Sequence, residues 1–304
     1  MAVLALLAGI VILAYSSDKA VEHSISIASR LGVSPLLVGL VVVSLGTDLP
    51  EIFNSIISWG IGHGDISVGD CFGSILVQIT LIVGLLALLG GAFKVKRDEM
   101  IVIGACELLA LIAAVSMVEK GYISRMNAIF LVASWPLLIL IIKNIMKKDY
   151  SKQQTERELH HHVIITIIGY TGVAIGAYIV INSVITLSAL LNIHEYLISF
   201  FIVAIGTSLP ELAVDLTAIR KKQYEIAIGD AIGSCLVDAS LSIGIGPLFF
   251  PNKVSGGLAE TTGLYALFAS IVVILTLALR QRLDKKAGLL FIIVYGFSYI
   301  LLYV

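Results

Sequence analysis

Long apolar runs separated by short polar loops dominate the pattern of hydrophobic and polar positions along this chain of 304 residues. Runs such as 75–92 and 163–181 are long enough, as helices, to cross roughly 30 Å of hydrocarbon. The pattern predicts ten membrane-spanning helices, at approximately residues 2–29, 35–59, 66–90, 99–118, 126–145, 163–189, 196–219, 226–249, 261–280 and 287–303. We therefore expect an all-α polytopic membrane protein.

The composition agrees with this fold class. The chain is 58% hydrophobic and 13% charged, whereas soluble domains carry about 25% charged residues. Its three cysteines, Cys71, Cys106 and Cys235, fall inside apolar runs at a spacing that fits neither a zinc site nor a disulfide framework. The sequence holds no basic patch of the size that binds nucleic acid. We expect the lipid bilayer as the environment, and no cofactor, nucleic acid or obligatory protein partner.

The distribution of Lys and Arg predicts the orientation of the chain. Sixteen of these residues lie in one set of alternate loops, and three, Lys120, Arg125 and Lys253, lie in the opposite set. Because cytoplasmic loops carry the excess of positive charge, we expect both termini outside the cytoplasm of a protein in the plasma membrane. The apolar run 1–15 lacks the basic start of a signal peptide and is interpreted as part of the first span.

A polar segment, residues 147–162, separates two halves of five predicted spans each, residues 1–146 and 163–304. The orientation places this linker in the cytoplasm. It ends in three consecutive histidines, which we interpret as a solvated loop or a helix start, with adventitious metal binding as the alternative.

The sequence repeats itself at a constant offset of 160 residues. Segment 46–51 (GTDLPE) recurs as 206–211 (GTSLPE), and the polar and apolar pattern of 66–77 recurs in 226–237. Because five spans fill one period and five is odd, the second copy enters the membrane from the opposite side. This inverted arrangement is typical of secondary transporters.

Each motif interrupts a predicted span with a proline. Pro50 lacks an N–H, and in a helix its ring collides with the carbonyl of Gly46; Pro210 repeats this effect. A carbonyl without a partner in hydrocarbon costs several kcal/mol unless it faces protein, water or an ion. A packing kink is the simpler explanation for one proline, but two symmetric kinks, each followed by a glutamate, favour an ion site.

Helical spacing aligns further polar residues with the two motifs. Four predicted helices carry one polar stripe each: Thr47, Glu51 and Ser55; Thr207, Glu211 and Asp215; Asp70, Ser74 and Gln78; and Asp230, Ser234 and Asp238. Stripes that only join helices favour Ser, Thr and Asn, whereas carboxylates within a membrane mark ion paths. Oxygen-only ligands suit Ca²⁺ better than soft metals. For Asp70 and Asp230, a structural role at a helix start is the equal alternative.

These two motifs, each followed by Gly-Asp-x-x-Gly-Ser, resemble the alpha-1 and alpha-2 repeats of the cation/calcium antiporter superfamily, and most closely the prokaryotic sodium/calcium exchangers. The resemblance covers essentially the whole chain. It implies that Glu51 and Glu211 hold Ca²⁺ with the backbone carbonyls of Thr47 and Thr207. It further implies Na⁺ sites made by Ser44, Thr47, Glu51 and Ser74 in the first half and by Ala204, Thr207, Glu211 and Ser234 in the second, with Asp238 at a central position that is Asp or Asn in the family.

The chain departs from that family at four positions, which are therefore additional candidates: Asp48 replaces a common Ser, Asp70 and Asp230 replace Asn, and Gln78 replaces Asn or Asp. The extra carboxylates add proton sites, because buried carboxyl groups hold protons more strongly. Proton/calcium exchangers, however, typically carry Glu where Ser74 and Ser234 stand. The resemblance thus favours Na⁺ as the coupling ion, with H⁺ and K⁺ as alternatives.

The expected function is exchange of Ca²⁺ for Na⁺ at this carboxylate site, with the first and sixth spans as the moving elements. A passive cation channel is one alternative, since charged rings also serve permeation. An enzyme is the other, because Gly62-His63-Gly64-Asp65 matches the GxGD pattern of intramembrane aspartyl proteases. That match lies in a short loop and ignores the repeat, so no enzymatic activity is expected.

Overall fold

The structure is a computed structural model that describes residues 34–146, 160–172 and 195–303, together with scattered residues of 7–27 and 175–179. The predicted spans 2–29 and 163–189 are therefore described only in part. The three histidines lie within residues 160–172, which are helical. The rest of the linker, residues 147–159, is not described.

In the first half, a helical run is bent at the first motif. This run comprises α2 (Pro35–Val38), the π-helix η1 (Gly39–Val43), α3 (Ser44–Thr47) and α4 (Leu49–Gly60). It is followed by α5 (Gly64–Leu76), the π-helix η2 (Val77–Ile82), α6 (Val83–Leu89), α7 (Arg97–Val118) and α8 (Arg125–Ile145).

The second half presents the same elements in the same order. These are α10 (Glu195–Ile198), the π-helix η3 (Ser199–Val203), α11 (Ala204–Thr207), α12 (Leu209–Arg220), α13 (Tyr224–Val237), the π-helix η4 (Asp238–Ser242), α14 (Ile243–Phe249), α15 (Gly256–Arg280) and α16 (Lys285–Tyr303). The sequence repeat is thus matched by a repeat of secondary structure, including its breaks and π-helical segments.

The helices have the length and composition that a membrane requires. Within the described residues, five are long and apolar enough to cross a bilayer, and counting each bent pair as one span raises the number to seven. The bends measure 44° between α3 and α4 and 42° between α11 and α12. The expected helical membrane fold is confirmed, whereas the number of ten spans and their inverted orientation stay predictions.

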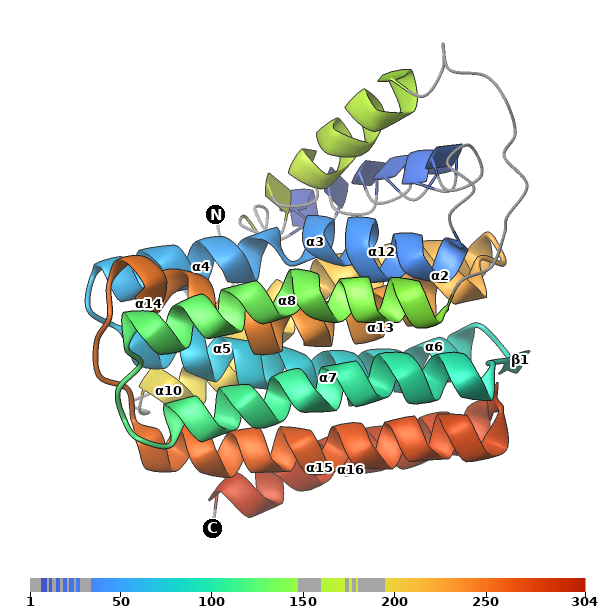
Figure 1. The fold of residues 1–304 in the computed structure, drawn as a ribbon. Coiled ribbons are helices and arrows are strands. Elements are labelled where there is room, and N and C mark those ends of the chain that lie inside the picture. Colours follow the sequence, from blue (N-terminus) through green and yellow to red (C-terminus); the bar gives the residue numbers. More distant parts are fainter. Residues whose placement is uncertain are drawn as a thin grey trace.

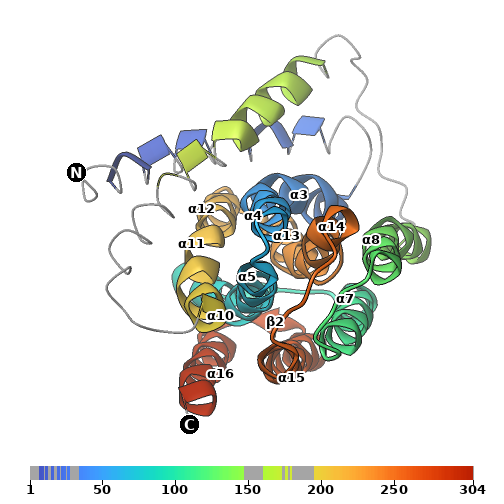
Figure 2. The ribbon, with the colours of Figure 1, turned by 90° about the vertical axis from the view of Figure 1, so that its left-hand side faces the viewer.

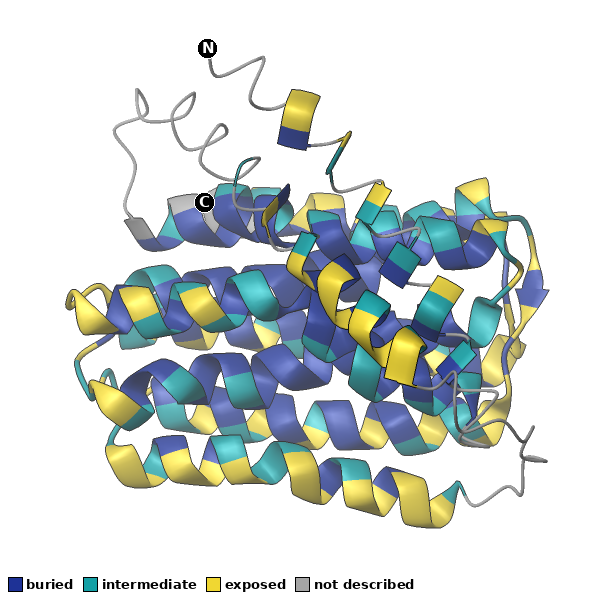
Figure 3. Cartoon of the chain, turned by 90° about the horizontal axis from the view of Figure 1, so that it is seen from above, coloured by how far each residue is buried: buried dark blue, intermediate teal, exposed yellow. Residues whose placement is uncertain are grey.

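The run from α5 to α6 and the run from α13 to α14 lie inside the helix bundle. Of the most apolar stretch in 224–249, 94% is buried, against 17% in α8. Seen end-on in Figure 2, α5 and α13 are surrounded by the remaining labelled helices, and Figure 3 shows most exposed positions on the outer helices. The outer helices in Figure 1 are less buried than the central ones because, in a membrane, they turn apolar side chains towards lipid.

Glycines let the two halves approach each other closely. The run α2–η1 packs against α13, and η3 with α11 packs against α5. A Cβ atom at Gly73 would lie 2.2 Å from the carbonyl oxygen of Phe200, and one at Gly229 would lie 2.3 Å from that of Leu36. Each central helix is therefore pressed against the bent run of the opposite half, a contact that only small residues permit.

The loops collect at two ends of the bundle. At one end β1 (Phe93–Lys94) pairs antiparallel with β2 (Arg282–Leu283), two short strands that the all-α prediction missed. At the other end Tyr122 forms an isolated bridge with Lys253. The loops expected on one side by their Lys and Arg content, 91–96, 221–223 and 281–284, thus do gather at one end.

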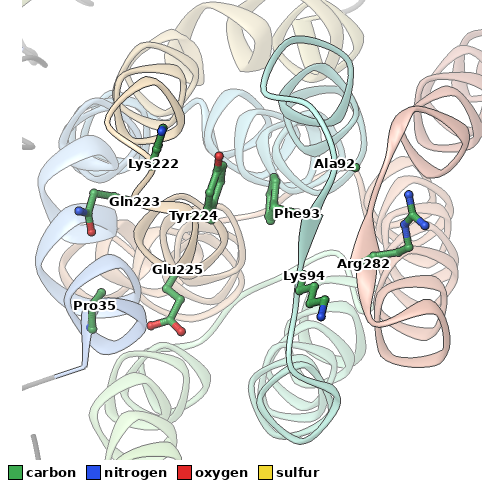
Figure 4. A pocket seen from close by; sticks show the side chains of 9 residues that line it. All are labelled: Pro35, Ala92, Phe93, Lys94, Lys222, Gln223, Tyr224, Glu225 and Arg282. Carbon is green, nitrogen blue, oxygen red and sulfur yellow. The ribbon is translucent and has the colours of Figure 1, made fainter.

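The positively charged end carries a surface cavity of about 720 Å³. Figure 4 shows its lining, in which the rings of Phe93 and Tyr224 stack at a centroid distance of 4.5 Å, with Lys222 on one side of this pair and Lys94 and Arg282 on the other. Nearby, Lys96 Nζ forms ion pairs with Glu99 at 3.0 Å and Glu225 at 2.5 Å. The residues that line the cavity do not include the candidate ion ligands.

Candidate ion-binding site

The two motifs break their helices at equivalent residues. Asp48 ends α3 with ψ of 5°, and Ser208 ends α11 with the same value. Pro50 and Pro210 then occupy the first turns of α4 and α12, where a missing N–H costs least. The kink that the sequence predicts at each proline is therefore confirmed, and a bend of 44° separates the helix that holds Thr47 from the helix that holds Glu51.

This break brings three carboxylates together. Oxygen atoms of Asp48, Glu51 and Glu211 all lie within 4.8 Å of one another, and each side chain is 0% exposed. None of their six carboxylate oxygens has a hydrogen-bond partner among the described residues. Ionised carboxylates buried in this way repel one another strongly unless a cation lies between them. The cluster therefore has the charge, the ligand type and the spacing of a cation site.

Asp238 and Gln78 border this cluster from the two central helices. Asp238 opens η4 and Gln78 is the second residue of η2, and the two side chains are neighbours. Both are 0% exposed and have no hydrogen-bond partner among the described residues. π-Helical turns widen a helix locally and frequently occur at functional sites. Here each central helix changes to π-helical geometry at the end of its polar stripe, where Gln78 and Asp238 lie.

The threonine hydroxyls of the motifs connect the halves. Thr207 Oγ1 donates to Asp70 Oδ1 at 2.9 Å and lies 3.1 Å from Ser74 Oγ. In the equivalent contact, Thr47 Oγ1 donates to Asp230 Oδ1 at 3.4 Å. Each threonine hydroxyl also lies 3.2–3.3 Å from two carbonyl oxygens of its own helical run, those of Val43 and Ser44 or those of Val203 and Ala204, so its single proton is shared between the two helices. The backbone carbonyls of both threonines are the atoms that the resemblance assigns to Ca²⁺.

Asp70 and Asp230 each lie two turns inside α5 and α13. The alternative that they sit at helix starts, stabilised by the helix dipole, is therefore wrong. Asp70 accepts a second hydrogen bond, from Asn54 Nδ2 to Oδ2 at 2.5 Å, whereas Asp230 Oδ2 has no partner among the described residues. The two aspartates occupy equivalent positions but have different partners.

The carbonyls of Ser44 and Ala204 lie at the ends of the first arms of the bent runs. Each already accepts a backbone hydrogen bond, from Asp48 N at 2.9 Å and from Ser208 N at 3.0 Å. Each oxygen also accepts from the threonine hydroxyl of its own motif, Thr47 Oγ1 at 3.2 Å or Thr207 Oγ1 at 3.3 Å, so its second lone pair reaches an ion only when that hydroxyl donates to the neighbouring helix instead. In contrast, Ser234 Oγ is buried without a partner among the described residues.

The structure thus brings together Glu51 and Glu211, as the sequence predicts, and adds Asp48 as a full member of the cluster. Asp48 was only an additional candidate, because its place depends on the helix break. Ser55, expected in the same stripe, instead accepts a hydrogen bond from Gly246 N at 3.2 Å and joins α4 to α14. The π-helical segments were not predicted, and the hydrophobic pattern holds no signal for them.

The GxGD segment has a structural role. Asp65 accepts hydrogen bonds from the backbone N and Oγ of Ser255, both at 2.5 Å, at the start of α15. The carboxylate thus closes the loop between α14 and α15. Another buried acid, Glu107 on α7, accepts a 2.8 Å hydrogen bond from Ser270 of α15. Neither of these carboxyl groups belongs to the central cluster.

Comparison with known proteins agrees with this geometry. A family model described as "Sodium/calcium exchanger protein" matches residues 1–143 and 161–304. The sodium/calcium exchanger MaX1 of Methanosarcina acetivorans is 27% identical over 99% of this chain and 98% of its own. The inner membrane protein YrbG of Escherichia coli is 29% identical over 82% of this chain and 80% of its own.

The fold is also similar to that of a solved membrane transporter. The sodium-calcium exchanger NCX_Mj, soaked with 100 mM Na⁺ and 10 mM Sr²⁺, superposes with a TM-score of 0.83 at 27% identity. The superposition covers 98% of this chain and 97% of that chain. The likeness therefore extends over both halves.

Proposed function

Because the chain belongs to the sodium/calcium exchanger protein family, we propose that it is a secondary active antiporter that exchanges Ca²⁺ for Na⁺ across the plasma membrane by alternating access. The observation that carries this proposal is the cluster of Asp48, Glu51 and Glu211, each of which places one oxygen within 4.8 Å of the other two. Two broken helices, one from each half, supply these oxygens. A site shared between repeats is typical of such transporters.

Calcium is the divalent ion that this ligand set fits best. Ca²⁺ takes 6–8 oxygen ligands at about 2.3–2.6 Å, and the cluster offers six carboxylate oxygens beside the carbonyls of Thr47 and Thr207. No Cys or His takes part in the cluster found in the described residues, which argues against softer metals. We assign Ca²⁺ to Glu51 and Glu211, with Asp48 as a further ligand.

Competition for these carboxylates explains the exchange. An ionised and empty cluster is costly to enclose in a low-dielectric membrane, so the carrier closes only when cations neutralise it. Ca²⁺ and several Na⁺ ions satisfy the same carboxylates and therefore bind in turn. We assign Na⁺ to Ser44, Thr47, Glu51 and Ser74, to Ala204, Thr207, Glu211 and Ser234, and to the region of Asp238.

The proposed mechanism needs the two halves to be inverted relative to each other in a bilayer. Ten spans with both termini outside the cytoplasm satisfy this condition, and the loops rich in Lys and Arg would then face the cytoplasm. The first and sixth spans are assigned the sliding motion that opens the site to one side at a time. Inverted halves make the two open states near mirror images of each other.

Proton-coupled calcium exchange is a second candidate, favoured by one observation. The chain places the extra carboxylates Asp48, Asp70 and Asp230 in its buried interior, all 0% exposed. A carboxylate can take a proton where it would otherwise need a metal ion. Ser74 and Ser234, which stand where proton exchangers typically have Glu, favour Na⁺.

Uptake of ⁴⁵Ca²⁺ into proteoliposomes under separate Na⁺, K⁺ and pH gradients tests the proposal. We expect an outward Na⁺ gradient to drive uptake, and Glu51→Gln to abolish it. Uptake driven by a pH gradient alone would replace Na⁺ by H⁺. Calcium flux that needs no counter-ion would identify a channel and overturn antiport.

A further inference from the structure

The two halves differ at a pair of positions on the second arm of each bent run. Helix α4 carries Asn54 and Ser55, whereas α12 carries Val214 and Asp215 at the equivalent positions. In the first half both oxygens of Asp70 are satisfied, one by Asn54 at 2.5 Å and the other by a threonine of the opposite half at 2.9 Å. The first half therefore holds a single, fully hydrogen-bonded carboxylate here.

The second half has no such arrangement. Val214 has no side-chain amide that could donate to Asp230, so Asp230 keeps only the 3.4 Å hydrogen bond from Thr47 to its Oδ1. Its Oδ2 has no partner among the described residues, and neither oxygen of Asp215 has one. The carboxyl groups of Asp215 and Asp230 are direct neighbours. Where the first half has one satisfied carboxylate, the second half has two unsatisfied ones side by side.

A hydroxyl group faces the same space. Ser234 Oγ, one turn after Asp230 on α13, is 0% exposed and has no hydrogen-bond partner among the described residues, yet it is a neighbour of the Asp230 carboxyl. Ionised carboxylates only accept hydrogen bonds, so two of them cannot satisfy each other. The buried hydroxyl beside them adds one more oxygen to a group of atoms that holds no positive charge.

From this arrangement we infer that Asp215 and Asp230 form an additional cation site beside the central cluster, and that its ligand is one Na⁺ ion. The Ser234 hydroxyl lies between this site and the Na⁺ site assigned above to Ala204, Thr207 and Glu211, and is shared by the two. The inference rests on the proposed exchange function for the identity of the ion. The oxygen atoms available to bind a cation are both oxygens of Asp215, Oδ2 of Asp230 and the serine hydroxyl. These are fewer than the 6–8 ligands of Ca²⁺. A monovalent ion suits this smaller set.

The position of the site couples it to calcium. Asp215 follows Glu211 by one turn of α12, and Asp230 is within electrostatic reach of Glu211. A cation bound by this pair therefore lowers the affinity of the central cluster for Ca²⁺. Binding at one site lowers affinity at the other by the same factor, so the pair increases the number of Na⁺ ions that compete with one Ca²⁺.

The repeat supplies a matched variant. The double substitution Val214→Asn and Asp215→Ser gives the second half the residues of the first, in which an amide satisfies the aspartate. We expect purified V214N/D215S to bind one ²²Na⁺ fewer per chain at saturation than the wild type, and to lower by about one the Hill coefficient with which Na⁺ displaces ⁴⁵Ca²⁺. Asp98→Asn, which removes an exposed carboxylate at the start of α7, is the control and should match the wild type.

The nearly isosteric variant Asp215→Asn repeats the test if the double variant does not fold, and size-exclusion chromatography decides which is used. Equal numbers of bound ²²Na⁺ in wild type and variant would overturn the site while leaving Na⁺/Ca²⁺ exchange intact. Loss of one bound ⁴⁵Ca²⁺ in place of ²²Na⁺ would overturn the choice of a monovalent ion. A wild type that binds no Na⁺ at all would overturn the proposed function together with the site.

Discussion

Thr207 Oγ1 donates a 2.9 Å hydrogen bond to Asp70 Oδ1, and these residues belong to opposite halves of the chain. The equivalent bond, from Thr47 to Asp230, measures 3.4 Å. Each broken helix is thereby fixed to the central helix of the other half. The two motifs can form one site because their positions depend on each other.

Asn54 completes the partners of Asp70, which predicts the effect of removing it. Asn54→Val, which copies Val214, leaves Asp70 Oδ2 buried without its 2.5 Å hydrogen bond. A buried acceptor without a partner costs about 1–3 kcal/mol, so we expect a lower thermal unfolding temperature in detergent. Adding Asp70→Asn removes the charge and should restore most of the loss. Equal destabilisation of the single and double variants would contradict this explanation.

Asp48 distinguishes the two motifs, and its removal should weaken calcium binding. Asp48→Ser gives the first motif the residue of Ser208 and takes one carboxylate from the cluster of three. We expect the dissociation constant for ⁴⁵Ca²⁺ to rise about 10-fold to 100-fold, since roughly 1.4 kcal/mol corresponds to each factor of ten. Equilibrium binding to purified protein measures this change. An unchanged constant would show that Asp48 is not a ligand.

The sequence predicts most of the helical framework and the pairing of Glu51 with Glu211. The predicted span 66–90 agrees with the observed run Gly64–Leu89, because long apolar segments with charged ends leave little choice. The repeat identified both glutamates, since a proline and an acid at equal offsets are rare in apolar runs. The helical spans and the two glutamates depend on residues close together in the chain, and a hydrophobic pattern detects such local features.

What the sequence could not predict depends on the three-dimensional contacts. Gln78 and Asp238 lie in the π-helices η2 and η4, but a π-turn leaves no mark in a helical hydrophobic period. Asp48 enters the cluster only because the helix ends there with ψ of 5°. The hydrogen bond from Asn54 to Asp70 joins α4 to α5, and the pattern of polar stripes does not predict this contact.

The close contact between the halves predicts which glycines are indispensable. A Cβ atom at Gly73 would lie 2.2 Å from the backbone oxygen of Phe200, so Gly73→Ala must push η3 away from α5. We expect destabilisation of about 1–3 kcal/mol, as for overpacked cores, and loss of Ca²⁺ uptake. Gly257→Ala is the control, because no atom lies within 4 Å of a Cβ there. Similar unfolding temperatures for both variants would contradict the proposed contact.

Asp65 is a structural carboxylate and not an ion ligand, and its substitution tests both this role and the protease alternative. Asp65→Ala removes the acceptor for both the backbone N and the hydroxyl of Ser255. A hydrogen bond contributes about 0.5–1.5 kcal/mol to stability, so we expect a lower unfolding temperature with Na⁺-driven ⁴⁵Ca²⁺ uptake preserved. Glu51→Gln should show the reverse, retaining the fold and losing uptake. Peptide cleavage by the wild type that disappears in Asp65→Ala would instead support an aspartyl protease, because hydrolysis requires that carboxylate and exchange does not.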